Sequence, residues 1–187
     1  IGKRFLFPGI GYGGSCFPKD VKALQKAGRD ESYDFKILDS VIEVNEKQKT
    51  ILFPKIQNFF NGDLSNKKLA VWGLAFKPET DDVREAPAIY LIEKLLNKGA
   101  SLSVYDPEAM PNIKKQFGET LNYCNSMYEA LENADALIIC TEWSIFRTPD
   151  FNKVKQLLKQ SIIFDGRNLY DVEEIKKEGF IYSSIGR

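Results

Sequence analysis

The alternation of short apolar runs with amphipathic stretches after residue 68 constrains the fold of this chain more than any other feature. Residues 69–76 (LAVWGLAF) predict a buried strand, residues 86–98 an amphipathic helix that stops at Gly99, and residues 101–106 a second strand. Strand, helix and strand at this spacing predict parallel pairing with a helical crossover. The pattern continues with helices expected over 108–117, 126–133, 151–159 and 171–178, and strands over 121–124, 136–141, 161–166 and 180–186. We therefore expect an α/β fold with an open parallel sheet that carries helices on both faces.

The first third of the chain follows a helical pattern instead. The apolar spacing over residues 35–60 predicts one helix of about 25 residues, with a kink at Pro54 or an end just before it. The polar cluster NGDLSNKK at 61–68 indicates a boundary between a helical region at 1–62 and a sheet domain at 63–187. So long a helix suits a connection between two bodies that also packs against a second copy of itself; a long core helix fits the pattern equally well.

Composition excludes several classes of function. The 26 basic and 26 acidic residues cancel, so nothing indicates a nucleic-acid or membrane surface. No apolar run approaches the roughly 20 residues of a membrane span. Three widely spaced cysteines without a CxxC pair argue against a disulfide framework or a zinc site and fit a reducing cytoplasm. Because histidine is absent, acid-base work falls to Asp, Glu, Lys or water, and no metal site is expected.

The stretch GYGGSCFPKD at 11–20 carries the strongest local chemistry, because it presents one cysteine between a glycine run and a helix opened by Pro18. The helix is expected to run to about Ala27, with Gly28 as its stop. Cys16 then lies near the positive end of the helix dipole, which favours the nucleophilic thiolate. Asp20, in the first turn, is placed to orient a water or accept a proton. A glycine-rich turn with an inert cysteine remains open on these grounds alone.

The spacing of Gly9, Gly11 and Gly14 also spells G-x-G-x-x-G, the dinucleotide fingerprint. A true fingerprint follows a buried strand and is followed by a second strand that ends in an acidic residue about 20 positions on. Residues 35–60 are predicted to be helical, so we interpret this glycine pattern as part of the loop over residues 9–16 that leads to Cys16, which we call the cysteine loop. Cys124 and Cys140 lie in expected strands and are interpreted as inert core thiols.

Charged residues follow the expected strands, at the edge where open parallel sheets bind ligands. Lys77 and Arg84 come after the first strand and suit an anionic ligand such as a phosphate. Asp81 or Asp82 is interpreted as the cap of the next helix, within a solvated loop. After a later strand, Gly166 permits close approach of the backbone, and Arg167 is placed to reach a ligand.

Five stretches in order resemble the nucleotide-sugar dehydrogenases. They are FLFPGIGYGGSCFPKD at 5–20, VNEKQK at 44–49, GLAFKPETDDVREAPA at 73–88, TEW at 141–143 and FDGRN at 164–168. The phenylalanine after the cysteine and the TEW stretch resemble the UDP-glucose branch more than the UDP-N-acetylmannosamine or GDP-mannose branches.

This resemblance implies an NAD-dependent enzyme with a Rossmann-like domain that oxidises the C6 alcohol of UDP-glucose to a carboxylate in two hydride transfers. It implies Cys16 as the nucleophile, Asp20 as its assistant in water and proton transfer, and Arg84 as the residue that reaches the NAD pyrophosphate. The helix over 35–60 would form much of a homodimer contact. The residues implied to bind the nucleotide sugar are Phe5, Leu6, Phe7, Pro8, Gly9, Gly13, Phe76, Lys77 and Arg167.

The sequence also departs from the family pattern. Complete members carry an amino-terminal NAD-binding domain and a segment with a catalytic lysine and asparagine, and neither is found here. We expect a carboxy-terminal portion of such an enzyme that does not turn over alone. A domain that only binds UDP-sugars or dimerises, and an enzyme for a sister sugar nucleotide, remain alternatives.

Overall fold

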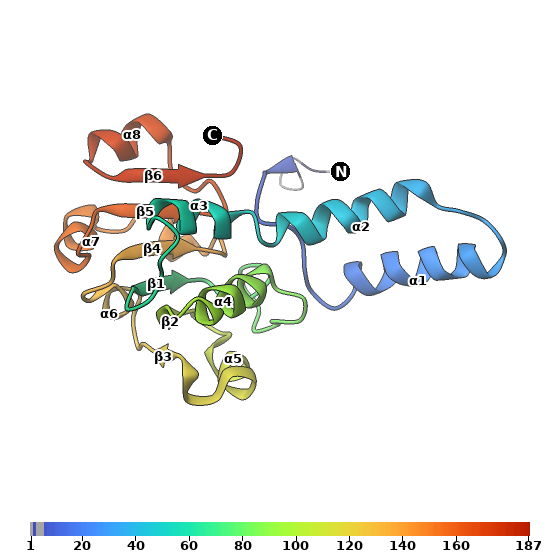
Figure 1. The fold of residues 1–187 in the computed structure, drawn as a ribbon, viewed down its shortest axis with the longest axis horizontal. Helices are drawn as coiled ribbons and strands as arrows, with labels where there is room; N and C mark the ends of the chain where they lie inside the picture. Colours follow the sequence, from blue (N-terminus) through green and yellow to red (C-terminus); the bar gives the residue numbers. More distant parts are fainter. Residues whose placement is uncertain (1, 3–5) are drawn as a thin grey trace.

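The computed structural model describes residue 2 and residues 6–187, and its centre is a six-stranded parallel sheet with the order β3-β2-β1-β4-β5-β6 (Figure 1). The chain reverses direction along the sheet between β1 and β4, which makes the carboxyl ends of these two strands the switch point where open sheets bind ligands. The strands are β1 (Lys68–Trp72), β2 (Ser101–Tyr105), β3 (Asn122–Tyr123), β4 (Ala136–Ile139), β5 (Ile162–Asp165) and β6 (Ile181–Ser184).

Helices cover both faces of this sheet, as predicted. Side chains alternate along β1, so that Leu69 and Val71 join one core cluster while Ala70 and Trp72 join the other. The first cluster includes residues of α3 (Leu52–Phe59), α4 (Pro87–Asn97) and α5 (Met110–Phe117). The second includes residues of α6 (Met127–Leu131), α7 (Phe151–Leu157) and α8 (Val172–Lys177). Short 3-10 turns lie at Gly118–Thr120 and Ser144–Phe146.

The single long helix expected over 35–60 is wrong, because the structure has two helices there. α2 (Lys36–Gln48) ends in a turn, and α3 starts afresh at Leu52. Pro54 explains where α3 starts: in a helix interior its ring would clash with the carbonyl four residues earlier, whereas as the third residue of α3 it lacks only an N–H that has no partner within the helix.

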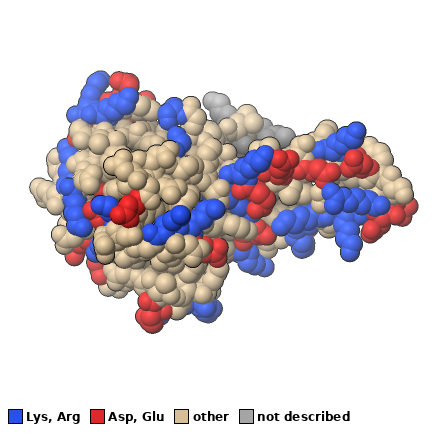
Figure 2. Space-filling model, in the orientation of Figure 1, with Lys and Arg blue, Asp and Glu red and all other residues tan. Residues whose placement is uncertain are grey.

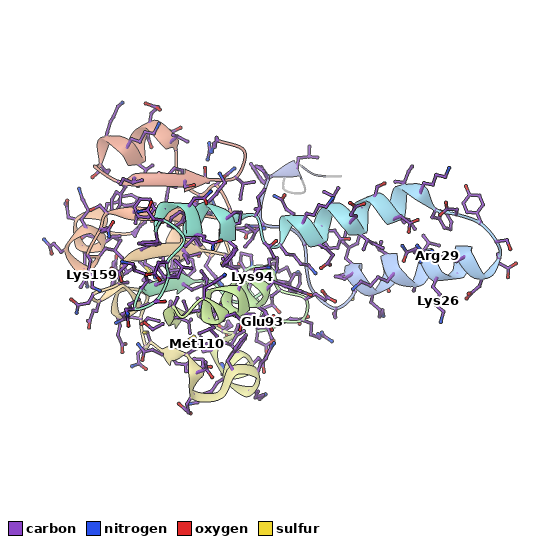
Figure 3. All side chains as sticks on the ribbon, in the orientation of Figure 1. Lys26, Arg29, Glu93, Lys94, Met110 and Lys159 are labelled. Atoms are coloured by element: carbon purple, nitrogen blue, oxygen red, sulfur yellow. The ribbon has the colours of Figure 1, made fainter. Side chains whose placement is uncertain are left out.

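α3 packs onto the sheet domain. Its residues Leu52 and Ile56 are buried in the first core cluster, and the Lys94 ammonium of α4 lies 5.5 Å from the centre of the Phe53 ring (Lys94 is labelled in Figure 3). The boundary expected after residue 62 therefore stays a prediction, although α3, which precedes it, belongs to the core of the sheet domain.

α1 (Phe17–Asp30) and α2 form an antiparallel hairpin that projects from the sheet domain (Figure 1). α1 passes Gly28, which was the expected stop. Gly28 serves packing instead, since an ideal Cβ there would lie 2.4 Å from the Phe35 ring. Arg29 of α1, labelled in Figure 3, donates to the Asp39 carboxylate of α2 over 2.7 Å. Figure 2 shows acidic and basic side chains intermixed along the hairpin.

Among residue 2 and residues 6–187, no helix combines the length and the apolar character that a membrane crossing requires.

Candidate functional site

Cys16 occupies the N-cap position of α1 and is exposed, with its sulfur 3.6 Å from the Ser15 hydroxyl. Pro18 lies in the first turn, as predicted. The other two thiols differ sharply: Cys124 and Cys140 are buried, and burial raises the pKa of both, that of Cys140 to about 12. The interpretation of these two as core thiols is confirmed, and Cys16 is the thiol open to a substrate.

Asp20 lies one turn along α1, where its backbone N–H donates to the Cys16 carbonyl over 2.8 Å. Its carboxylate is exposed and 3.5 Å from the Lys19 ammonium. The backbone thus fixes the place of Asp20 relative to Cys16, while its side chain stays open to solvent. Its role in proton transfer remains a prediction.

The glycines before Cys16 press against the segment that follows β1. An ideal Cβ on Gly13 would lie 2.2 Å from the Glu85 carbonyl oxygen, and one on Gly14 would lie 2.8 Å from the Phe76 ring. The Gly14 N–H donates to the Arg84 carbonyl over 2.8 Å. No side chain fits at either glycine, so the loop and the segment lie backbone to backbone. The structure thereby brings Phe76 and Arg84 to the cysteine loop.

Arg167 reaches the same loop from the end of β5. An ideal Cβ on Gly9 would lie 2.6 Å from the Arg167 Nη1, and the Nη2 donates to Glu142 over 2.6 Å. Gly166 permits this approach, since a Cβ there would lie 2.8 Å from the Ile10 side chain. Among the described residues the buried Nε of Arg167 and the Oε2 of Glu142 have no hydrogen-bond partner. Such atoms at a ligand-binding edge are ready for a polar ligand.

Two residues of α2 complete the anchoring of the loop, and sequence reasoning assigned neither a role. Asn45 accepts the Tyr12 N–H over 2.8 Å and donates to the Tyr12 carbonyl over 3.2 Å. Gln48 donates to the Gly9 carbonyl over 2.6 Å. The usable signal was present in VNEKQK, because Asn45 lies three positions before Gln48 and thus on the same side of a helix, on the stripe that otherwise carries apolar residues.

Arg84 is exposed and forms a double hydrogen bond with Asp82, whose carboxylate oxygens each lie 2.9 Å from its guanidinium. This contact lowers the pKa of Asp82 and raises that of Arg84. The expectation that Asp81 or Asp82 caps the next helix is wrong: the N-cap of α4 is Ala86, and Asp82 instead accepts the Arg84 N–H over 3.0 Å. An anion that binds Arg84 therefore competes with Asp82.

The remaining candidates lie around this loop or outside the described residues. Lys77 has its ammonium 5.5 Å from the centre of the Phe76 ring. Leu6, Phe7 and Pro8 are exposed. Phe5 lies outside the described residues.

The glycine pattern at 9–14 is not a dinucleotide loop, as interpreted from the sequence. Residues 6–16 form no strand in the structure, and α1 begins only at Phe17, three residues after the last glycine. The strand and helix that a fingerprint joins are therefore not arranged around this pattern.

Comparisons with known proteins cover the whole chain. Residues 70–172 match the UDP-binding domain of the UDP-glucose/GDP-mannose dehydrogenase family, and residues 1–47 match the central domain of that family. The chain is 46% identical over 187 residues to UDP-glucose 6-dehydrogenase TuaD of Bacillus subtilis, with all of this chain and 40% of the relative aligned. It is 44% identical over 192 residues to the UDP-glucose 6-dehydrogenase of Pseudomonas aeruginosa, again over its full length and 42% of the relative.

Among solved structures, a UDP-glucose dehydrogenase from the archaeon Pyrobaculum islandicum superimposes with a TM-score of 0.82 at 32% identity, covering 98% of this chain and 40% of the other. The chain thus spans about two fifths of the length of the relatives it matches.

Proposed function

Because the chain belongs to the UDP-glucose/GDP-mannose dehydrogenase family, we propose that it contributes the nucleophile and the nucleotide-sugar side of an active site that oxidises UDP-glucose to UDP-glucuronate with NAD. The observation that carries this proposal is the convergence on one loop: the exposed Cys16 follows glycines that press against Phe76, the Arg84–Glu85 backbone and Arg167. A thiol at a helix N-terminus beside two arginine-bearing segments suits an anionic sugar nucleotide.

In the proposed reaction the C6 alcohol first loses one hydride and one proton and becomes the aldehyde. The Cys16 thiolate then adds to C6, and protonation of the oxygen gives a thiohemiacetal. Loss of hydride from C6 gives a thioester, and water hydrolyses it to the carboxylate and the free thiol. Asp20 assists the water and proton transfers. Phe76, Lys77, Gly13 and Arg167 hold the nucleotide sugar, together with the segment from Phe5 to Gly9.

NAD would supply the hydride acceptor, and the complete reaction would consume two NAD molecules, one for each hydride. Arg84 is the residue of this chain that we assign to its pyrophosphate: its side chain is exposed, and its guanidinium already binds an oxyanion, the Asp82 carboxylate, through two donors. The Arg84 guanidinium therefore suits a pyrophosphate, because each phosphate group offers a similar pair of oxygens.

Ligand protection of Cys16 tests this function directly. We expect iodoacetamide to modify Cys16 well before Cys124 and Cys140 in the folded chain, and saturating UDP-glucose to slow that modification. Calorimetric titration with UDP-glucose, GDP-mannose and UDP-N-acetylmannosamine then ranks the three substrates, and we expect UDP-glucose to bind most tightly. Modification that no sugar nucleotide slows, or equal labelling of the three thiols, would contradict the proposal.

A turnover assay separates the nucleotide-sugar side from the complete reaction. The two matched domains are the central and the UDP-binding domains. We therefore expect the 187-residue chain to bind UDP-glucose without producing NADH. Clear NADH production by this chain would refute that division of labour. An exposed thiol stays reduced in the cytoplasm, where we place this activity.

We also propose that the chain forms a homodimer through α2. Ile37, Val41 and Val44 form an exposed apolar stripe on that helix and line an open hollow of about 500 Å³. Exposed apolar side chains at this helical spacing suit the packing of a second helix. Sedimentation velocity is expected to show a dimer that Val44→Glu converts to a monomer; a monomeric parent chain would rule the dimer out.

A further inference from the structure

The turn after α2 holds a buried lysine, Lys49. Its side chain is 1% exposed, yet its ammonium donates to Glu85 over 2.7 Å and to Glu46 over 2.8 Å. It also lies 4.2 Å from the centre of the Tyr90 ring. A buried ammonium without partners would be strongly unfavourable, so these contacts fix the side chain in place.

Glu85 collects contacts from three separate elements. Besides Lys49, its carboxylate accepts the Tyr90 hydroxyl of α4 over 2.5 Å and the Lys22 ammonium of α1 over 3.1 Å. Its backbone has a φ of +53°, a left-handed conformation that is unfavourable for a residue other than glycine. The three hydrogen bonds to its carboxylate can hold Glu85 in that backbone conformation.

The cysteine loop packs directly against the backbone of Arg84 and Glu85. Its carbonyl faces Gly13, and the preceding carbonyl, that of Arg84, accepts the Gly14 N–H over 2.8 Å. Cys16 lies two residues beyond Gly14. The side-chain contacts of Glu85 therefore fix both the loop that carries the nucleophile and the residue proposed to bind the NAD pyrophosphate.

We infer that Glu85 is a positioning residue, held by Lys49, Tyr90 and Lys22, that sets the cysteine loop and Arg84 in register with each other. We call these four side chains the Glu85 clamp. The inference rests on the proposed function for the roles of Cys16 and Arg84, whereas the contacts themselves do not. Glu85 touches neither reacting atoms nor ligand in this assignment and acts through the backbone of its neighbours.

Hydrogen exchange at the Gly14 amide tests the clamp without any catalytic assay. In Glu85→Gln we expect this amide to exchange at least tenfold faster, because the acceptor carbonyl of Arg84 is no longer held, while the amides of β1 and β4 keep their protection. The matched control is Glu46→Gln, which removes the other carboxylate from Lys49 but leaves the contact with the loop. It is expected to change the Gly14 rate less than twofold.

Lys49→Met tests the same contact from the other side and serves if Glu85→Gln does not accumulate as folded protein. In the double variant the Gly14 amide should exchange no faster than in the faster single variant, because both substitutions remove the same contact between Lys49 and Glu85. Unchanged exchange at Gly14 in folded Glu85→Gln or Lys49→Met, or equal acceleration throughout the sheet, would overturn the inference. Cys16 labelling that UDP-glucose does not slow would instead overturn the proposed function and leave the clamp standing.

Discussion

The acid sensitivity of this protein should depend on Glu85. Hydrogen bonds from Lys49 and then Tyr90 lower the pKa of Glu85 from 4.5 to about 2. A pKa difference of this size corresponds to about 3 kcal/mol of stability at neutral pH, at roughly 1.4 kcal/mol per pKa unit. The Glu85 side chain is 31% exposed, so solvent screening reduces this figure, and we expect about 2 kcal/mol.

The sign follows from proton binding. The pKa of Glu85 is lower in the folded chain, so the unfolded chain takes up a proton first as the pH falls. The stability that Glu85 contributes is therefore fully present above the unfolded pKa of 4.5 and is lost as the pH falls through the folded pKa. Roughly three fifths of a 2 kcal/mol contribution is lost by pH 3.5. The Glu85 carboxylate accepts hydrogen bonds from Lys49 on the α2 side, Tyr90 of α4 and Lys22 of α1, and Tyr12 lies close enough to feel its charge. Lys49 stays protonated over this range: burial alone would lower the pKa of Lys49, but hydrogen bonds to Glu46 and Glu85 outweigh it and raise that pKa.

Urea unfolding of the parent chain and of Glu85→Gln at pH 7 and pH 3.5 measures this effect. The variant is expected to be about 2 kcal/mol less stable at pH 7, and the gap should narrow to about 0.8 kcal/mol at pH 3.5. Glu93→Gln is the matched control on the exposed face of α4 (labelled in Figure 3) and should stay within about 0.5 kcal/mol of the parent. A gap that is the same at both pH values, or no larger than that of the control, would refute the reasoning.

Three further substitutions address other contacts. Gly13→Ala should destabilise the chain by about 1–3 kcal/mol in urea unfolding, because its Cβ would overlap the Glu85 carbonyl at 2.2 Å; an unchanged midpoint would show that the loop is not pressed there. Glu142→Gln replaces the charged partner of Arg167 and should weaken UDP-glucose binding about threefold to tenfold by calorimetry, whereas unaltered binding would dissociate this pair from the ligand. Asp106→Asn should cost about 2–4 kcal/mol in the same unfolding assay, since the buried carboxylate accepts four backbone N–H groups and the Trp143 indole; a loss below about 1 kcal/mol would contradict that account.

The sheet could be predicted because its central strands are continuous apolar runs, which is the sequence pattern of parallel strands buried on both faces. The ends of α1 and α2 were not, since a helical period in the sequence runs unbroken through residues 49–51 and Gly28 looks like a stop. In the structure Pro54 sets the start of α3, and the Phe35 ring occupies the space beside Gly28. The local sequence pattern alone predicts neither of these two features.

The residues of the candidate site could be predicted from the sequence, but the contacts between them could not. Cys16, Phe76, Arg84 and Arg167 stood out through their motifs, and the structure brings them to one loop. The pairing of Lys49 with Glu85 joins residues 36 positions apart whose charges, in the sequence, look like solvated ones. Burial converts them into a clamp, and burial is a tertiary property.

The contact between Gly9 and Arg167 has a consequence for the order of assembly. The cysteine loop lies near the start of the chain, whereas the side chain that covers it follows the fifth strand, so this contact closes only after most of the sheet exists. During synthesis the thiol leaves the ribosome long before its surroundings do. The loop that carries Cys16 is therefore synthesised early, and it gains its contact with Arg167 only after the second half of the chain has been translated.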